Sequence, residues 1–104
     1  AYVRIAIQDS TGESDAVQSL VEHLREAGYR NISVDNSWHE PLRVSRIVAQ
    51  QGDNESATAI RTHLGFGEVR VESTGNLASD VTIQLGEDWL QKEASAETRS
   101  SSIF

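Results

Sequence analysis

The strongest constraint on the fold is a local pattern that occurs twice in the chain, at an offset of about 40 residues. Each copy begins with an alternating apolar segment, RIAIQ at residues 4–8 and RIVAQ at residues 46–50. Each continues into an amphipathic segment with a His-Leu pair and ends at a Gly that precedes an aromatic residue. The pattern predicts two strand-helix-strand units in tandem. It is compatible with an internal duplication or with a shared architecture alone.

The apolar periodicity predicts the element order βαββαββ. Alternating apolar residues, the period of a strand, occur at residues 2–8, 30–35, 42–50, 67–72 and 80–85. Apolar residues at i, i+3 and i+4 predict helices at residues 15–27 and 56–64, each followed by a Gly. Because each helix must bury one apolar stripe and crossovers are right-handed, both helices are expected on one face of a single mixed sheet. The predicted fold class is an α+β two-layer sandwich of ferredoxin-like topology with an added strand.

One domain is predicted at residues 1–89, since a chain of 104 residues is the usual size of a single domain. Its expected core consists of Val3, Ile5, Ile7, Leu20, Leu24, Ile32, Val34, Ile47, Ile60, Leu64, Val69, Val71, Val81 and Ile83. Residues 90–104 form a polar tail. The tail is expected to contain the end of a short helix at residues 88–98, followed by mobile residues that cannot repay their ordering entropy by burial.

Composition excludes several classes of function. With 9 Lys and Arg against 16 Asp and Glu, the formal net charge is -7, so binding to nucleic acid is not expected. The chain has no Cys, which rules out disulfides, thiolate nucleophiles and zinc sites built on sulfur. No apolar run approaches the length of about 20 residues that spans a bilayer. The absence of an initial Met suggests a piece of a longer chain or a processed product.

No catalytic, cofactor-binding or metal-binding residue is predicted. His23, His39 and His63 have no metal-ligand spacing, and no GxSxG turn marks a nucleophile. The acidic pairs Glu87-Asp88 and Asp53-Glu55 are most simply turn and helix-start residues that complement a helix dipole.

The candidate interaction surface consists of Ser10, Thr11, Gly12, Trp38, His39 and Trp89. The loop at residues 10–12 can offer backbone N–H groups to an anion, although it lacks the spacing of a phosphate-binding loop. Trp38 and Trp89 can stack on a sugar or anchor a partner. The structural alternative is an ordinary turn for the loop, and closure of the end of a small core for each Trp.

Several segments together resemble the LytR C-terminal domain, which often follows the catalytic domain of LytR-CpsA-Psr cell-envelope proteins. They are VRIAIQDSTG at residues 3–12, LREAGY at 24–29, SRIVAQ at 45–50, ATAIRTHLG at 57–65 and DVTIQLGEDW at 80–89. The Asn-Gly type turn usual after the first strand is replaced here by Gln8, Asp9 and Thr11-Gly12. The matched motifs are core and turn positions, and the catalytic residues of the family belong to a different domain.

The resemblance implies a non-catalytic accessory domain of a bacterial, extracytoplasmic envelope protein. Such a domain would assist attachment of glycopolymers to the cell wall or localisation at the envelope, with wall polymer or another envelope protein as partner. Any membrane attachment would come from another part of the parent chain. The alternatives are a regulatory domain of a transcriptional attenuator without direct DNA contact and, less favoured, a small hydrolase.

Overall fold

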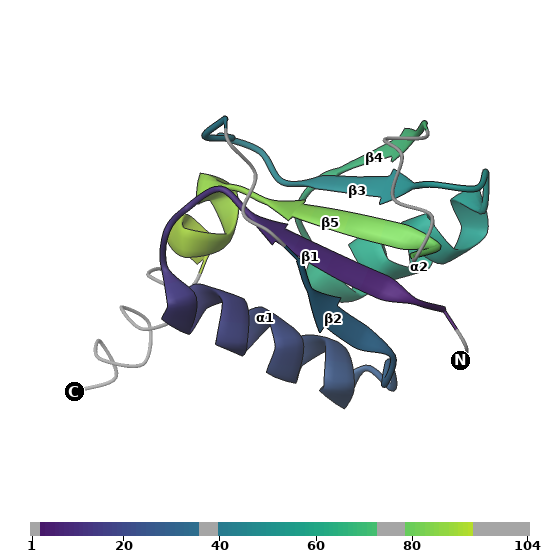
Figure 1. Ribbon diagram of the computed structural model, residues 1–104, viewed down its shortest axis with the longest axis horizontal. Coiled ribbons are helices and arrows are strands. Elements are labelled where there is room, and N and C mark those ends of the chain that lie inside the picture. The colour runs from purple at the N-terminus through teal and green to yellow at the C-terminus, as the bar shows by residue number, and fades with distance from the viewer. Residues whose placement is uncertain (1–2, 36–39, 73–78, 93–104) are drawn as a thin grey trace.

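The computed structural model describes residues 3–35, 40–72 and 79–92, and it has the predicted order of strands and helices (Figure 1). The elements are β1 (Ile5–Asp9), α1 (Ser14–Glu26), β2 (Ile32–Val34), β3 (Arg46–Ala49), α2 (Asn54–Leu64), β4 (Glu68–Val71) and β5 (Val81–Leu85). A further helical segment occupies residues 87–92. Among the described residues, no helix is long and apolar enough to cross a lipid bilayer.

The strands form a single mixed sheet in the order β2-β1-β5-β3-β4. Strand β1 is parallel to β2 and β5, whereas β3 is parallel to β4 and antiparallel to β5. The single mixed sheet is confirmed, but the strand order differs from the predicted ferredoxin-like topology, in which each strand-helix-strand unit is split by another strand. Here the strands of each unit are neighbours, and β5 joins the two units. All residues of β5 are buried, which suits this central position.

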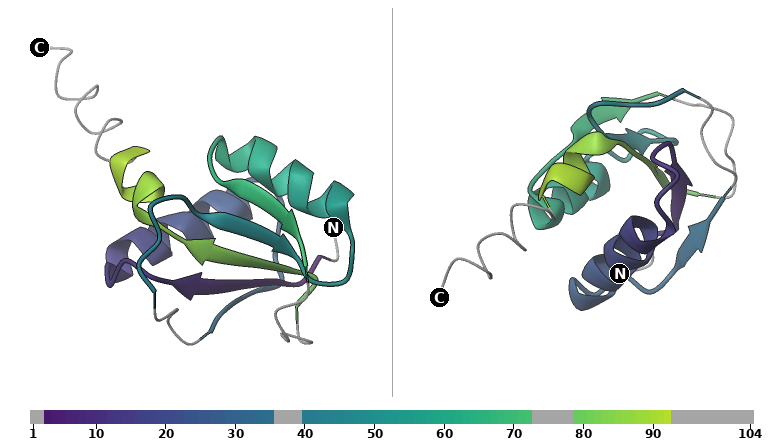
Figure 2. Two further views of the ribbon diagram at one scale, coloured as in Figure 1. Left: turned by 90° about the horizontal axis from the view of Figure 1, so that it is seen from above. Right: turned by 90° about the vertical axis from the view of Figure 1, so that its left-hand side faces the viewer.

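Both helices cover the same face of the sheet, which curves around them (Figure 2). Leu20 and Leu24 of α1 pack in one cluster with Ile60 and Leu64 of α2. The sheet side of this core is formed by alternate residues of the central strands: Ile5, Ile7, Ile47, Ala49, Val81, Ile83 and Leu85. The two helices also touch directly, since Nε2 of His23 lies 3.2 Å from the carbonyl oxygen of His63.

The core prediction is wrong at both edges of the sheet. Val34 at the end of β2 is 58% exposed, and Val71 at the end of β4 is 57% exposed. Both residues fit the alternating pattern that predicts a buried strand face. They are exposed because β2 and β4 are the edge strands of the described sheet, each with a neighbouring strand on one side only. Val3, Ile32 and Val69 are partly buried against the core, and the other predicted members are fully buried.

The helix-free face of the sheet carries a buried polar group of side chains. Nε2 of Gln50 donates to Oγ1 of Thr82 over 2.8 Å, and Oγ of Ser79 lies 2.9 Å from the same atom. Further along β5, Nε2 of Gln84 donates to Oε1 of Gln8 over 3.2 Å. These contacts connect β5 to both of its neighbours, β1 and β3.

Residues 87–92 close the end of the core as a helix. Ser45 helps to anchor this helix, because its N–H donates over 3.0 Å and its hydroxyl over 2.6 Å to the carboxylate of Asp88. Lys92 Nζ donates to the carbonyl oxygen of Leu64 and lies 5.8 Å from the centre of the Phe66 ring. Within the described residues the helix extends to residue 92. The rest of the predicted helix and tail lies outside the described residues.

Candidate functional site

In the loop after β1, the carboxylate of Asp9 accepts hydrogen bonds from the backbone N–H groups of the loop itself. Asp9 accepts hydrogen bonds from the N–H of Thr11 at 2.9 Å, from the Thr11 hydroxyl at 2.6 Å and from the N–H of Gly12 at 3.0 Å. An anion at this loop would need the same N–H groups and would meet a carboxylate. This geometry favours the turn alternative for Thr11 and Gly12.

Ser10 connects three segments of the domain. Its hydroxyl donates to the carbonyl oxygen of Leu85 over 2.7 Å and accepts from the N–H of Leu42 over 3.1 Å. Both bonds join the end of β1 to segments distant in sequence, so Ser10 has a structural role that the sequence pattern did not reveal.

Trp89 lies inside the core and is only 3% exposed. Its indole N–H donates to the carbonyl oxygen of Ala16 over 3.0 Å. The ring stacks on Phe66 with centroids 4.9 Å apart, and it meets the His23 ring edge to face at 5.8 Å. This placement favours the core-closing alternative for Trp89. Trp38 and His39 lie outside the described residues.

No group of three or more His, Cys, Asp or Glu side chains that could hold a metal ion occurs among the described residues. Ser45 and Asp88 place a hydroxyl beside a carboxylate, but the contacts of this pair are structural. Ser45 Oγ donates to Asp88 and also accepts from the N–H of Gly86 over 2.8 Å. Both contacts hold the start of the last helix. His23 and His63 lie where the two helices meet, and their rings meet those of Trp89 and Tyr29 edge to face.

A groove between α1 and the edge strand β2 offers an accessible surface of a different kind. Its volume is about 490 Å³. Its lining residues are Ser14, Val17, Gln18, Val21 and Arg25 of α1 and Ile32 and Val34 of β2. On the helix side the groove is lined by a second apolar stripe, Val17 and Val21, beside the stripe that faces the core. This second stripe is only partly buried.

The main chain of β2 is open on the groove side. The N–H of Ile5 donates to the carbonyl of Asn31, and the N–H of Asp35 donates to the carbonyl of Ile7, each over 2.8 Å. In this parallel register the alternate residues, Ile32 and Val34, direct their N–H and C=O groups away from β1. No strand lies beyond β2 among the described residues. The same two residues therefore provide apolar side chains to the groove and, at its edge, backbone groups that no other described strand pairs with.

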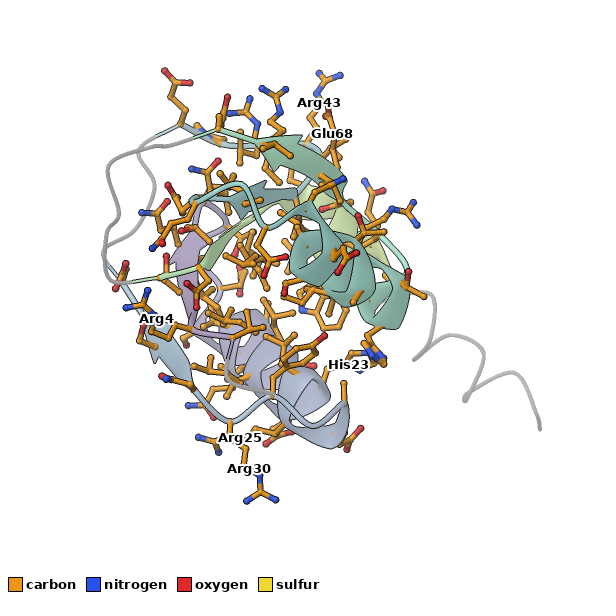
Figure 3. All side chains as sticks on the ribbon, turned by 90° about the vertical axis from the view of Figure 1, so that its right-hand side faces the viewer. Arg4, His23, Arg25, Arg30, Arg43 and Glu68 are labelled. Carbon is orange, nitrogen blue, oxygen red and sulfur yellow. The ribbon has the colours of Figure 1, made fainter. Side chains whose placement is uncertain are left out.

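Two arginines lie at one end of the groove. Arg25 contributes to the groove and, with Arg30, lines an adjoining hollow of about 360 Å³. Figure 3 shows the two side chains near each other at the lower end of the molecule, extended outward. Neither is in an ion pair with another described residue, whereas Arg4 is paired with Asp80 at 3.1 Å.

Sequence analysis missed this groove because its apolar residues have the same periodicity as core residues. Ile32 and Val34 were assigned to the core, and the Val17–Val21 stripe adjoins it on the helix. The signal that could have found it is the width of the apolar face of α1, which exceeds what one sheet contact buries.

Comparisons with known proteins give the chain its family. No curated protein matches the chain. The solution structure of the C-terminal domain of RV0431 is similar, with a TM-score of 0.51 and 18% sequence identity over 81% of this chain and 71% of that chain. At this identity the likeness concerns the fold. The family model described as LytR cell envelope-related transcriptional attenuator matches residues 2–89, and the chain therefore belongs to the LytR C-terminal domain family.

Proposed function

We propose that the domain is a non-catalytic binding module of an extracytoplasmic cell-envelope protein, and that the α1–β2 groove is its binding surface. In this role it assists attachment of glycopolymers to the cell wall, or keeps the parent protein at the envelope. The observation that carries the proposal is the combination, at one place, of an apolar groove, a strand edge and two arginines, with no strand beyond that edge and no ion pair of these arginines among the described residues.

Membership of a family described as cell-envelope-related supports the setting. The chemistry of the site supports binding over catalysis. The groove presents valine and isoleucine side chains and guanidinium groups, and it contains no pair of a nucleophile and a base. Arginine at the end of an apolar groove serves to orient a bound acidic group.

Co-sedimentation with insoluble cell wall that retains its attached glycopolymer and bound proteins tests the proposal. The full chain is compared with Val34→Lys and Arg25→Glu, which change the groove, and with Val71→Lys, the matched change at the opposite edge. We expect about tenfold less sedimentation for the two groove variants and unchanged sedimentation for Val71→Lys. Failure of the unaltered chain to sediment, or equal loss in all three variants, would contradict the proposal.

A further inference from the structure

We infer that the occupant of the α1–β2 groove is an extended polypeptide segment, which adds to β2 as a further strand and places an acidic group against Arg25 and Arg30. The inference rests on the proposed function, because it names the chemistry of the partner at the same site.

The first argument is the open main chain of β2. Ile32 and Val34 offer N–H and C=O groups at the spacing of a strand, which only another extended polypeptide can satisfy in register. An acyl chain has no donors or acceptors for these groups. A glycan has hydroxyls, but they do not follow the main-chain repeat of a strand.

The second argument is the shape and lining of the groove. A strand added to β2 would point alternate side chains toward α1, where Val17 and Val21 face Ile32 and Val34. The stretch of α1 along the groove, from Ser14 to Arg25, is about 16 Å long at 1.5 Å per residue. An extended segment of about five residues covers this length. Its inward side chains must be apolar, because the floor consists of branched aliphatic groups.

The third argument is charge. Because α1 and β2 run in opposite directions, Arg25 and Arg30 lie at the end where β2 begins, and Ser14 lies at the end where β2 finishes. A guanidinium binds a carboxylate through two parallel hydrogen bonds, and neither of these two has an acidic partner among the described residues. The partner segment is therefore acidic at this end, despite the net negative charge of the domain.

The probes for the test are acetylated, amidated heptapeptides of the form TVTVTDD and TVTVTKK, together with acidic versions that have Leu or Phe in place of Val. All of these peptides share the alternating pattern. TVTVTDD and TVTVTKK differ only in the charge of one end, and the Leu and Phe versions differ from TVTVTDD only in the apolar residue. We expect an acidic peptide to bind about tenfold more tightly than its lysine counterpart, and the preference to weaken as salt is added. We expect Arg25→Glu combined with Arg30→Glu to reverse this preference.

Backbone pairing is tested separately. Hydrogen exchange of the Ile32 and Val34 amides should slow when the acidic peptide binds. A peptide methylated on alternate amide nitrogens, those that would face β2, should lose at least about tenfold in affinity. Val34→Lys should weaken binding by a similar factor, and Val71→Lys should leave it unchanged.

The outcomes separate this inference from the proposed function. If no acidic peptide binds, but co-sedimentation with cell wall still depends on Val34 and Arg25, the strand inference is overturned and the proposed function stands. Binding of dodecanoate in the groove without peptide binding, or a dimer of the chain that Val34→Lys dissociates, would likewise overturn it. If the groove variants affect neither assay, both proposals fail.

Discussion

The two strand-helix-strand units have the same architecture, but one is open and the other is closed. In the second unit α2 packs directly on β4, and Nε of Arg61 donates to the carbonyl oxygen of Gly67 over 3.3 Å at the entry to that strand. In the first unit α1 lies farther from β2 and leaves the groove. When His23-Leu24 is aligned with His63-Leu64, Arg61 corresponds to Val21. A long polar side chain reaches the loop before β4 in the second unit, and a short apolar one lines the groove in the first.

The connection from helix to strand is longer in the first unit than in the second. Helix α2 ends at Gly65, which adopts a left-handed conformation with φ 74°, and β4 begins at Glu68. Helix α1 is followed by Ala27, Gly28, Tyr29, Arg30 and Asn31 before β2 begins. The longer connection also supplies Arg30. Small local differences in two similar units are thus enough to create a groove in one of them.

The largest predicted effect concerns Trp89, which connects the two units. It contacts Phe66 after α2 and both Ala16 and His23 of α1. We expect Trp89→Ala to lower the free energy of unfolding by about 3–5 kcal/mol, measured by urea denaturation. Trp89→Phe should cost less, since it keeps the stacking and loses the hydrogen bond to Ala16. A cost below about 1 kcal/mol for Trp89→Ala would contradict its place in the core.

Equivalent core positions in the two units should be equally sensitive. Leu20 and Ile60, which correspond in the alignment, are both fully buried, so truncation of either to Ala should cost about 2–5 kcal/mol. Val34→Ala and Val71→Ala serve as matched controls at the exposed edges and should change stability by about 0.5 kcal/mol or less. If Val34→Ala were as costly as Leu20→Ala in urea denaturation, β2 would be packed like a core strand and the groove would not exist.

The first unit can be given the arginine that stands at the matching position of the second, Arg61. Val21→Arg is expected to place a long side chain across the α1–β2 groove, with its aliphatic stem over the apolar floor. Co-sedimentation with cell wall should fall about tenfold, while stability changes by about 0.5 kcal/mol or less. The matched change Arg61→Val in the second unit should leave co-sedimentation unaltered. Full binding by Val21→Arg would show that the groove is not the contact surface.

The smallest predicted effect is on acid stability, and it involves two carboxylates, Asp80 before β5 and Asp53 at the start of α2. The hydrogen bonds from Arg4 lower the pKa of Asp80, and those from Ser56 lower the pKa of Asp53 at the start of α2. Since both folded-state pKa values lie below the unfolded value of about 3.9, their stabilisation is present above that pH and is lost as the pH falls through the folded pKa. The start of α1 lacks this contribution, because Glu13 makes no side-chain capping bond.

Urea denaturation between about pH 2 and 7 checks this difference. Asp80→Asn and Asp53→Asn should each flatten the loss of stability below about pH 4. A profile for Asp80→Asn that is parallel to that of the unaltered chain would contradict the assigned role of the Arg4 pair.

The order of elements could be predicted from sequence because the periods of strands and helices are local properties. Strand order could not, since it depends on which distant segments pair. Thr82 and Gln84 made β5 resemble a strand with one wet face, but both are buried by pairing with polar neighbours on β1 and β3. The position of β5 between the two units was therefore hidden.

The candidate site was harder to predict than the fold. Trp89 follows the last strand and was assigned to a candidate surface, because the short helix that turns it inward has little apolar pattern of its own. Ser10 and Thr11 were singled out by residue type, while the carboxylate of Asp9 that binds the loop donors was not considered. Val34 was read as core because alternation does not reveal whether a strand lies at an edge.

The most direct test of an open first unit and a closed second unit is a nuclear magnetic resonance titration of the full chain with the acidic heptapeptide TVTVTDD. The account predicts chemical-shift changes confined to β2, the Val17–Val21 side of α1 and the segment around Arg30, with slowed exchange at the amides of Ile32 and Val34. Strand β4 should be unaffected. Shift changes centred on β4, or spread evenly over both edges of the sheet, would contradict it.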